Sequence, residues 1–172
     1  VEERACDTSG VKQKDATCMM LELVGSADKQ IAQRSMAFVR KLVQREESMK
    51  DTMVEMGMHR AMLARGKDCA EDGEMCGVVC HGVEALITSS NSQRLLEEGL
   101  VEEGMELLKA HEEDEEAVRR AMAMLSLLVN DSEGGAARLL AAGGVALVLR
   151  MMKRHMERES VVEPSCCILW VL

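Results

Sequence analysis

The chain has 172 residues, 47% of them hydrophobic, with one Pro, one Phe, one Trp and no Tyr. Because Ala, Leu, Glu, Met and Arg are abundant and favour helix over strand, we expect an all-α fold with a sizeable core. The formal net charge of −9 argues against nucleic acid and anionic membranes as partners, since both attract a basic surface. No apolar run approaches the roughly 18 to 20 residues that a helix needs to cross a bilayer.

Seven cysteines form an odd set without the spacing of a small disulfide scaffold, and no signal peptide precedes them. Such usage is typical of a reducing compartment, so we expect a cytoplasmic protein, with the nucleus as the alternative. The chain opens on Val1 and stops at Leu172 within an apolar helical run, which indicates a fragment or processed piece of a longer protein.

The predicted elements repeat along the chain. An apolar stripe with helical spacing begins at Ile31 and begins again, 42 or 44 residues apart, at Met75, Ala117 and Val161. This period is typical of helical solenoid repeats. The positions four, eight and eleven residues after each start share one helical face, and we expect them to fill the core. The four stripes are Ile31, Ser35, Val39 and Leu42; Met75, Val79, Val83 and Leu86; Ala117, Ala121, Leu125 and Leu128; and Val161, Ser165, Leu169 and Leu172.

Two further helices precede each of the later stripes. Gly57, Gly99 and Gly143 each stand 18 residues before a stripe and directly after a short helix that contains an apolar pair. Glycine accepts left-handed backbone angles, so we expect a sharp turn at each of these positions. Polar residues at 89–92 and 130–132 are expected to cap the short helices that follow them. The second helices are predicted over 14–24, 58–68, 100–111 and 144–156.

Two local features modify this pattern. Gly73, Gly77 and Gly82 lie in the third helix of the second unit, and each interior glycine costs about 1 kcal/mol relative to Ala. We therefore predict that this unit is the least stable one and acts as a hinge. Pro164 suits only the first turn of a helix, so we expect the last helix to start near Glu163.

With these motifs the chain resembles the armadillo repeat family. The resemblance rests on the segments GLVEEGMELLKAH followed by AVRRAMAMLSLLV, and GGVALVLRMMKRH followed by VVEPSCCILWVL. It covers about residues 13–172 and is weaker in the first unit, where Gln13 replaces the glycine. The resemblance implies a single domain over 1–172, a right-handed α-solenoid of about four three-helix repeats with the last one truncated. The repeats would span about 5–45, 46–89, 90–131 and 132–172.

In armadillo proteins the third helices line a concave groove that holds extended peptides or partner helices, and the resemblance implies the same surface here. The face opposite the stripes supplies the candidate groove residues, which are Gln33, Ala37, Arg40, Gln44, His81, Glu84, Arg119, Ala123, Ser126, Asn130 and Trp170. Nuclear-import armadillo receptors carry a ladder of Trp and Asn on this face. The equivalent places here hold Ala37, His81, Ala123 and Cys167, and Lys41, Ala85, Leu127 and Val171. The absence of that ladder disfavours the import of basic signals.

Two features of the groove have alternative explanations. Trp170 is either an aromatic anchor for a partner or packs against a following repeat that is missing from this chain. Arg40 and Arg119 either clamp carboxylates of an acidic peptide or are solvated or paired within the protein, as with Glu84.

Residues 97–116 carry the strongest charge feature, with ten acidic residues against one lysine. These acids either face water and favour the positive end of a helix dipole, or form a docking patch for a basic partner.

The remaining motifs do not indicate catalysis. No Ser/His/Asp arrangement, P-loop or GxGxxG motif occurs, and Cys76, Cys80 and His81 lack the spacing of a zinc site. His111 and His155 stand at equivalent helix ends, where we expect helix-terminal cations or polar caps. We therefore expect a non-enzymatic protein without cofactor or metal. It is either a scaffold that holds another protein in its groove, or a regulatory or assembly module of a larger protein or complex with any catalysis elsewhere.

Overall fold

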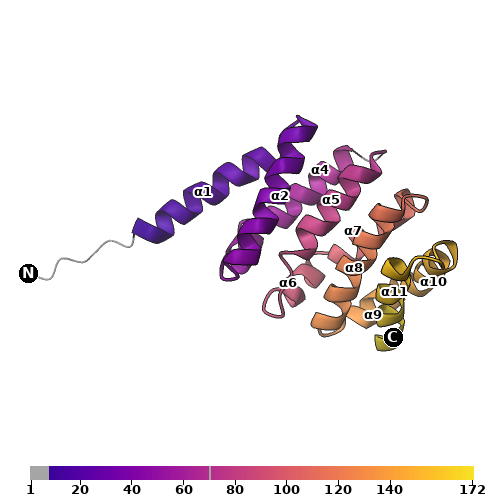
Figure 1. The fold of residues 1–172 in the computed structure, drawn as a ribbon. Coiled ribbons are helices and arrows are strands. Elements are labelled where there is room, and N and C mark those ends of the chain that lie inside the picture. The colour runs from indigo at the N-terminus through magenta and orange to yellow at the C-terminus, as the bar shows by residue number, and fades with distance from the viewer. Residues whose placement is uncertain (1–7, 70) are drawn as a thin grey trace, which may run out of the picture.

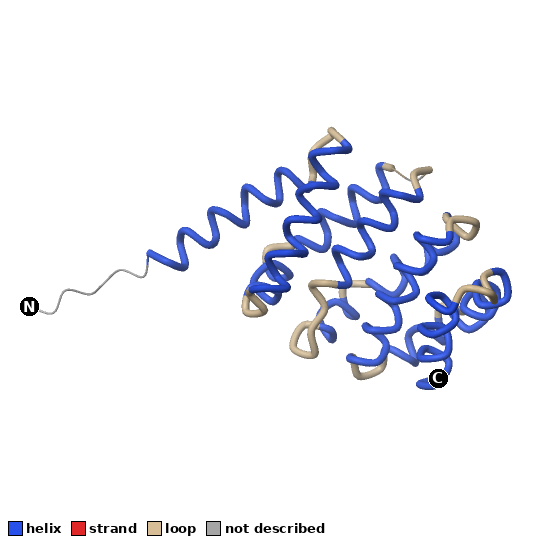
Figure 2. The backbone as a smooth tube through the Cα atoms, viewed as in Figure 1, coloured by secondary structure: helices blue, strands red, loops and turns tan. Residues whose placement is uncertain are grey.

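The computed structural model describes residues 8–69 and 71–172, and every regular element in them is a helix (Figure 1). Loops and turns join the helices throughout (Figure 2). The all-α prediction is confirmed. In chain order the helices are α1 (Thr8–Val24), α2 (Lys29–Arg45), α3 (Met49–Glu55), α4 (Met58–Asp68), α5 (Gly73–Glu84), α6 (Ser92–Glu97), α7 (Leu100–Ala110), α8 (Glu115–Asp131), α9 (Gly135–Ala141), α10 (Gly144–Arg154) and α11 (Glu159–Val171).

The helices belong to three classes that recur in the same order. Short helices α3, α6 and α9 precede second helices α4, α7 and α10, and each of these precedes a third helix, α5, α8 or α11. Helices α1 and α2 correspond to a second and a third helix. The third helices lie side by side in chain order, from α2 through α5 and α8 to α11 (Figure 1). The predicted second helices are confirmed, with ends that differ by at most two residues except in α1, which begins at Thr8.

The predicted glycine turns are confirmed. Gly57, Gly99 and Gly143 have φ angles of +85°, +92° and +75°, and each directly precedes a second helix. Side chains with a Cβ are strained at such angles, which explains why glycine recurs there. Gly134 has a φ of +82° before α9 and is a further turn that the sequence analysis did not identify.

The predicted core stripes hold for the later third helices and fail in part for the first. The stripes of α5 and α8 are at most 1% exposed, and α11 buries Val161 and Ser165 fully while Leu169 and Leu172 are half-buried. In α2 the prediction fails at Ile31, which is 43% exposed, and holds at Val39, which is fully buried. The other buried residues of that helix are Ala32, Met36 and Val43.

The position of α2 in the array explains this failure. A Cβ added at Gly82 of α5 would lie 4.0 Å from the Met36 Cβ of α2, and one added at Gly77 would lie 3.8 Å from the Ala117 nitrogen of α8. The stripe side of α5 and α8 therefore packs against the third helix that precedes it. No third helix precedes α2 among the described residues, so the same side of α2 keeps part of its exposure.

Aspartates begin three of the four third helices. The carboxylates of Asp72 and Asp114 each accept a hydrogen bond from the N–H group three residues later, those of Met75 and Ala117, at 3.1 and 2.9 Å. The carboxylate of Asp28 accepts two such bonds, at 2.8 and 3.0 Å. These caps satisfy N–H groups that have no partner inside the helix.

The caps predicted for the short helices are wrong. Helices α6 and α9 follow Asn91 and Gly134, and neither residue makes a side-chain cap. The Asn91 amide instead donates to Asp51 Oδ1 at 2.8 Å and to the Leu86 carbonyl at 2.9 Å. Its side chain therefore joins the loop before α6 to α3 of the preceding unit.

The last third helix begins earlier than predicted. Helix α11 starts at Glu159 and contains Pro164, so the expected start near Glu163 is wrong. Proline removes one N–H group, whose helical acceptor would be the carbonyl of Ser160. Val161 in the first turn is fully buried, so the earlier start places a core residue inside the helix.

No single helix in the described part of the chain is both long and apolar enough to cross a membrane. Helices α9 and α10 reach the necessary length and apolar composition only when they are taken together, and they are bent by 85° relative to each other.

Candidate binding surface on the third helices

The outer surface of the third helices carries two hollows. The first, which we call the α8 hollow, has a volume of about 440 Å³, and the second, the α5 hollow, has a volume of about 380 Å³. The α8 hollow is lined by Glu84, Arg119, Ala123, Ser126, Leu127, Asn130, Ser160, Glu163, Pro164 and Cys167. The α5 hollow is lined by Arg40, Glu74, Gly77, Val78, His81, Asp114, Glu116 and Arg120.

Seven of the eleven predicted groove residues line these hollows. Five of them lie in the α8 hollow, and Arg40 and His81 lie in the α5 hollow. Gln33, Ala37 and Gln44 on α2 line neither hollow. Trp170 is 90% exposed near the end of α11 and also lines neither.

The sequence analysis missed several residues of this surface. Glu116 and Arg120 line the α5 hollow but lie outside the positions assigned to the groove face. Their spacing of four residues on a helix brings them together, and Arg120 Nε donates to Glu116 Oε1 at 2.9 Å. This i, i+4 pair of opposite charge was the signal that could have identified them.

A neutral histidine and an arginine meet in the α5 hollow. Arg40 Nη1 of α2 donates to His81 Nδ1 of α5 at 2.5 Å. Burial, together with the charges of Arg120, Arg40 and Arg119, lowers the pKa of His81 to about 4. The imidazole is therefore neutral at pH 7 and can accept this bond. Arg40 forms no ion pair with any described residue, so its positive charge is not neutralised by a carboxylate in contact with it.

Glu84 differs from the other carboxylates of this surface. Burial raises its pKa, although the charges of Arg120, Arg119 and Arg40 oppose that effect. Its Oε2 atom is buried and has no hydrogen-bond partner among the described residues. Arg119 is paired within the protein, as one of the two explanations held, but its partner is Glu116 and not Glu84; Glu116 Oε2 accepts from Arg119 Nε at 2.8 Å.

The arrangement offers hydrogen-bond donors beside an unbonded acceptor. Arg40 in the α5 hollow keeps N–H groups free for a ligand, and Glu84 Oε2 in the α8 hollow lacks a donor. Ser126 and Asn130 add a hydroxyl and an amide, and Asn130 Nδ2 donates to the Ser126 carbonyl at 2.7 Å. Such a mixed surface can bind polar groups of a peptide. In the described residues, no group of three His, Cys, Asp or Glu side chains is arranged to hold a metal ion.

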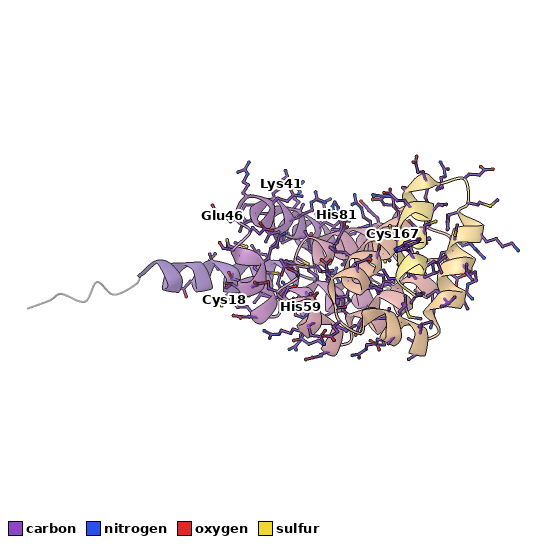
Figure 3. The ribbon with its side chains drawn as sticks, turned by 90° about the horizontal axis from the view of Figure 1, so that it is seen from below. Cys18, Lys41, Glu46, His59, His81 and Cys167 are labelled. Atoms are coloured by element: carbon purple, nitrogen blue, oxygen red, sulfur yellow. The ribbon has the colours of Figure 1, made fainter. Side chains whose placement is uncertain are left out.

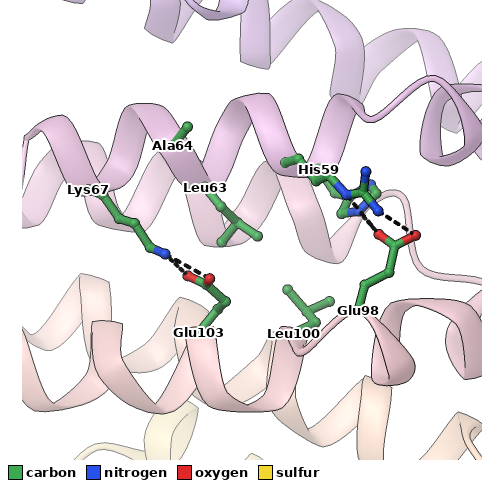
Figure 4. A pocket seen from close by; sticks show the side chains of 8 residues that line it. His59, Leu63, Ala64, Lys67, Glu98, Leu100 and Glu103 are labelled. Carbon is green, nitrogen blue, oxygen red and sulfur yellow. Dashed lines mark hydrogen bonds and ion pairs between the residues drawn. The ribbon is translucent and has the colours of Figure 1, made fainter.

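A further hollow of about 270 Å³ lies between α4 and α7 (Figure 4). The His59 side chain is on the opposite side of the molecule from His81 and Cys167 (Figure 3). His59 Nε2 donates to Glu98 Oε2 at 2.6 Å, and its buried Nδ1 has no partner among the described residues. Burial lowers the pKa of His59, although Glu98 opposes that effect. The sequence analysis did not identify His59, because one histidine in a helix has no pattern that reveals its partner.

The acidic residues of 97–116 are mostly paired with cations of this chain. Arg138 of α9 donates to Glu102 at 2.7 Å, and Lys67 of α4 contacts Glu103 at 2.6 Å. The other pairs are Glu98 with Arg60 and Arg94, Glu112 with Arg150 and Arg154, Glu113 with Arg154, Glu115 with Arg158, and Glu116 with Arg119 and Arg120. A basic partner at this segment would have to displace these internal pairs.

The two predicted terminal histidines both follow second helices. His155 lies directly after α10, and its Nε2 donates to the carbonyl of Glu112 at 2.9 Å, which joins neighbouring units. His111 lies directly after α7 and is buried, and its Nε2 has no hydrogen-bond partner among the described residues. Both histidines therefore stand at helix ends as predicted, but neither side chain bonds the helix that it ends.

Comparison of the chain with protein-family models, with curated proteins and with solved structures found no match.

Proposed function

We propose that this chain is a non-enzymatic interaction module, an α-solenoid of armadillo-type repeats whose third helices bind a segment of another protein. The order of the helices and the side-by-side packing of α2, α5, α8 and α11 support the solenoid. The armadillo assignment rests on the repeat motifs of the sequence. The segment would lie across the α5 and α8 hollows, as an extended peptide or a helix.

The observation that carries this proposal is the pair of adjacent hollows with unsatisfied polar groups. A buried carboxylate oxygen without a donor costs about 1–3 kcal/mol, so a ligand that donates a hydrogen bond to such an atom gains affinity. Glu84 Oε2 is such an atom, and Arg40 forms no ion pair with a described residue, although its charge acts on Glu84. A bound segment that donates to Glu84 and accepts from Arg40 would satisfy both.

Peptides selected from a random library on the immobilised protein test this function. We expect the selected peptides to lose at least about tenfold in affinity, roughly 1.4 kcal/mol, when Ala123→Arg fills the α8 hollow. Arg119→Glu should weaken them as well. The matched control is Ala146→Arg, which places the same side chain at an exposed position of α10. If the peptides bind the Ala123→Arg variant with the same affinity as the Ala146→Arg variant, the third helices are not the binding surface.

A further inference from the structure

Helix α2 is basic in an acidic protein. It contains five lysines and arginines and no acidic residue, whereas the whole chain has a net charge of −9. One side of the helix, which we call the α2 end face, consists of Ile31, Arg34, Phe38, Lys41 and Arg45, at helical spacings of three or four residues. All five are exposed, with Ile31 at 43% and Phe38 at 55%. Figure 3 shows Lys41 at the edge of the molecule that α2 forms.

The apolar residues of the α2 end face occupy packing positions. Asp28, Asp72 and Asp114 precede α2, α5 and α8, and Arg158 precedes α11, so the four helices can be aligned by these residues. In that alignment Ile31 and Phe38 correspond to positions that are buried in all three later helices. The equivalents of Ile31 are Met75, Ala117 and Val161, and those of Phe38 are Gly82, Met124 and Ile168. The α2 end face is thus shaped to receive a helix.

The cations of the α2 end face form no ion pair with any residue that the structure describes. Eleven of the eighteen lysines and arginines between residues 15 and 172 form ion pairs. Four of the seven that form none with described residues lie on α2, and they include Arg34, Lys41 and Arg45. Three unpaired cations beside two exposed apolar residues favour an acidic, amphipathic binding partner.

We propose that an acidic amphipathic helix of a partner protein docks on the α2 end face. Its apolar side would cover Ile31 and Phe38, and its carboxylates would contact Arg34, Lys41 and Arg45. The face runs over 14 residue steps, about 21 Å at 1.5 Å per residue, so the partner helix has about four turns. This site is separate from the α5 and α8 hollows of the proposed groove.

Stacking of a second copy in the repeat register would bring like charges together. Where two third helices pack side by side within the chain, the first residue of the earlier helix lies against the residue that precedes the later helix. Lys29 contacts Asp72 at 2.6 Å, and Arg158 contacts Glu115 at 3.0 Å, so both pairs are of opposite charge. A second copy would place Glu159 against Asp28, which repel each other. The charge pattern therefore favours a different, acidic helix.

Isothermal titration with two designed helical peptides of about 16 residues tests the proposal. Both carry the same apolar seam, one with Glu and the other with Lys at the flanking positions. We expect the Glu peptide to bind and the Lys peptide not to bind. Lys41→Glu/Arg45→Glu should weaken the Glu peptide at least about tenfold, and Phe38→Ala should also weaken it. Lys109→Glu/Lys153→Glu is the control, because it makes the same charge change at exposed, unpaired lysines. Unfolding curves verify that each variant is folded.

Four results would overturn this proposal. They are equal binding of both peptides, no binding of the Glu peptide at about 1 mM, an equal loss in the control variant, and affinity unchanged by Phe38→Ala. Sedimentation of the chain alone tests whether a second copy covers the α2 end face. Self-association that Phe38→Ala abolishes would show that a second copy is the partner. Vesicles containing phosphatidylserine that displace the Glu peptide would assign the face to a membrane instead.

Discussion

Single aspartates set where the long helices begin. The Asp114 carboxylate accepts from the Ala117 N–H group at 2.9 Å, which places a negative charge at the positive end of α8. We expect Asp114→Ala to lower the free energy of unfolding by about 1 kcal/mol in urea titrations. Asp131→Ala is the control, because Asp131 is an exposed residue at the other end of the same helix. Equal effects of the two substitutions would contradict a role for the cap.

The half-buried His81 makes the stability depend on pH. The pKa of His81 is about 4 in the folded chain against an ordinary 6.5, so the unfolded chain binds its proton first as the pH falls. The contribution of His81 is complete above pH 6.5 and is lost as the pH falls toward 4, while Glu84, with its raised pKa, acts in the opposite direction. We expect a lower urea midpoint at pH 5 than at pH 7.5, and a smaller difference in His81→Gln. A midpoint that rises toward pH 5 would contradict this sign.

At the scale of the helix, the glycines of α5 have different surroundings. A Cβ at Gly77 would meet Glu116 Cγ at 3.5 Å, an ordinary contact, whereas one at Gly82 would lie 2.9 Å from the Met62 sulfur. We expect Gly77→Ala to raise the free energy of unfolding by about 0.5–1 kcal/mol, because alanine favours the helix. Gly82→Ala, the matched change in the same helix, should gain less because Met62 must move. Thermal or urea unfolding of the two variants measures the difference, and equal gains would contradict the steric argument.

The same glycines lead us to predict that α5 is the hinge of the chain. Interior glycines weaken a helix, and α5 contains two of them, Gly77 and Gly82, after Gly73 as its first residue, while α8 contains none. Amide hydrogen exchange should be faster over 73–84 than over 115–131 at pH 7. Exchange over 73–84 that is as slow as over 115–131 would show that packing compensates for the glycines.

Local sequence patterns predicted the positions of the helices well, but they predicted the packing of each helix against its neighbours less well. The turns at Gly57, Gly99 and Gly143 follow from backbone sterics alone, so the second helices were located to within two residues in three units. The stripe at Ile31 failed because its burial depends on whether another helix lies in front of α2. Pro164 violates a local rule because the core position of Val161 favours an earlier helix start. Tertiary contacts, which spacing does not encode, decided both cases.

The candidate surface shows the same division. Helical periodicity placed Arg40 and His81 on one side of the third helices, because that side follows from spacing on each helix. It could not reveal that Arg40 bonds to His81 or that Arg119 prefers Glu116, since these choices depend on side-chain geometry. It also could not reveal that Trp170 lines neither hollow, because that depends on how α11 lies against α8.

For the whole molecule, the acidic segment 97–116 acts as an electrostatic link between units. Its carboxylates receive Lys67 from the preceding unit and Arg138, Arg150, Arg154 and Arg158 from the following one. Burial acts to raise the pKa of Glu102, but the hydrogen bond and the charge of Arg138, together with a backbone hydrogen bond, lower that pKa below its ordinary value. The carboxylates of 97–116 would repel one another in an isolated unit, and the cations of the neighbouring units therefore compensate that repulsion.

Two variants with the same net charge distinguish the stability that these ion pairs contribute from the effect of the general repulsion in an acidic protein. In the first, the four following-unit arginines, at 138, 150, 154 and 158, become Gln. In the second, Arg34, Lys41, Arg45 and Lys153, which form no ion pair with described residues, become Gln. Both change the net charge from −9 to −13, since four positive charges are removed. At about 0.2–1 kcal/mol per exposed pair, we expect the first variant to lose about 1–3 kcal/mol more than the second in urea titrations. The difference should shrink at 1 M salt, where the Debye length falls to about 3 Å. Equal losses, or a difference that salt leaves unchanged, would show that the acidic segment does not hold the units together.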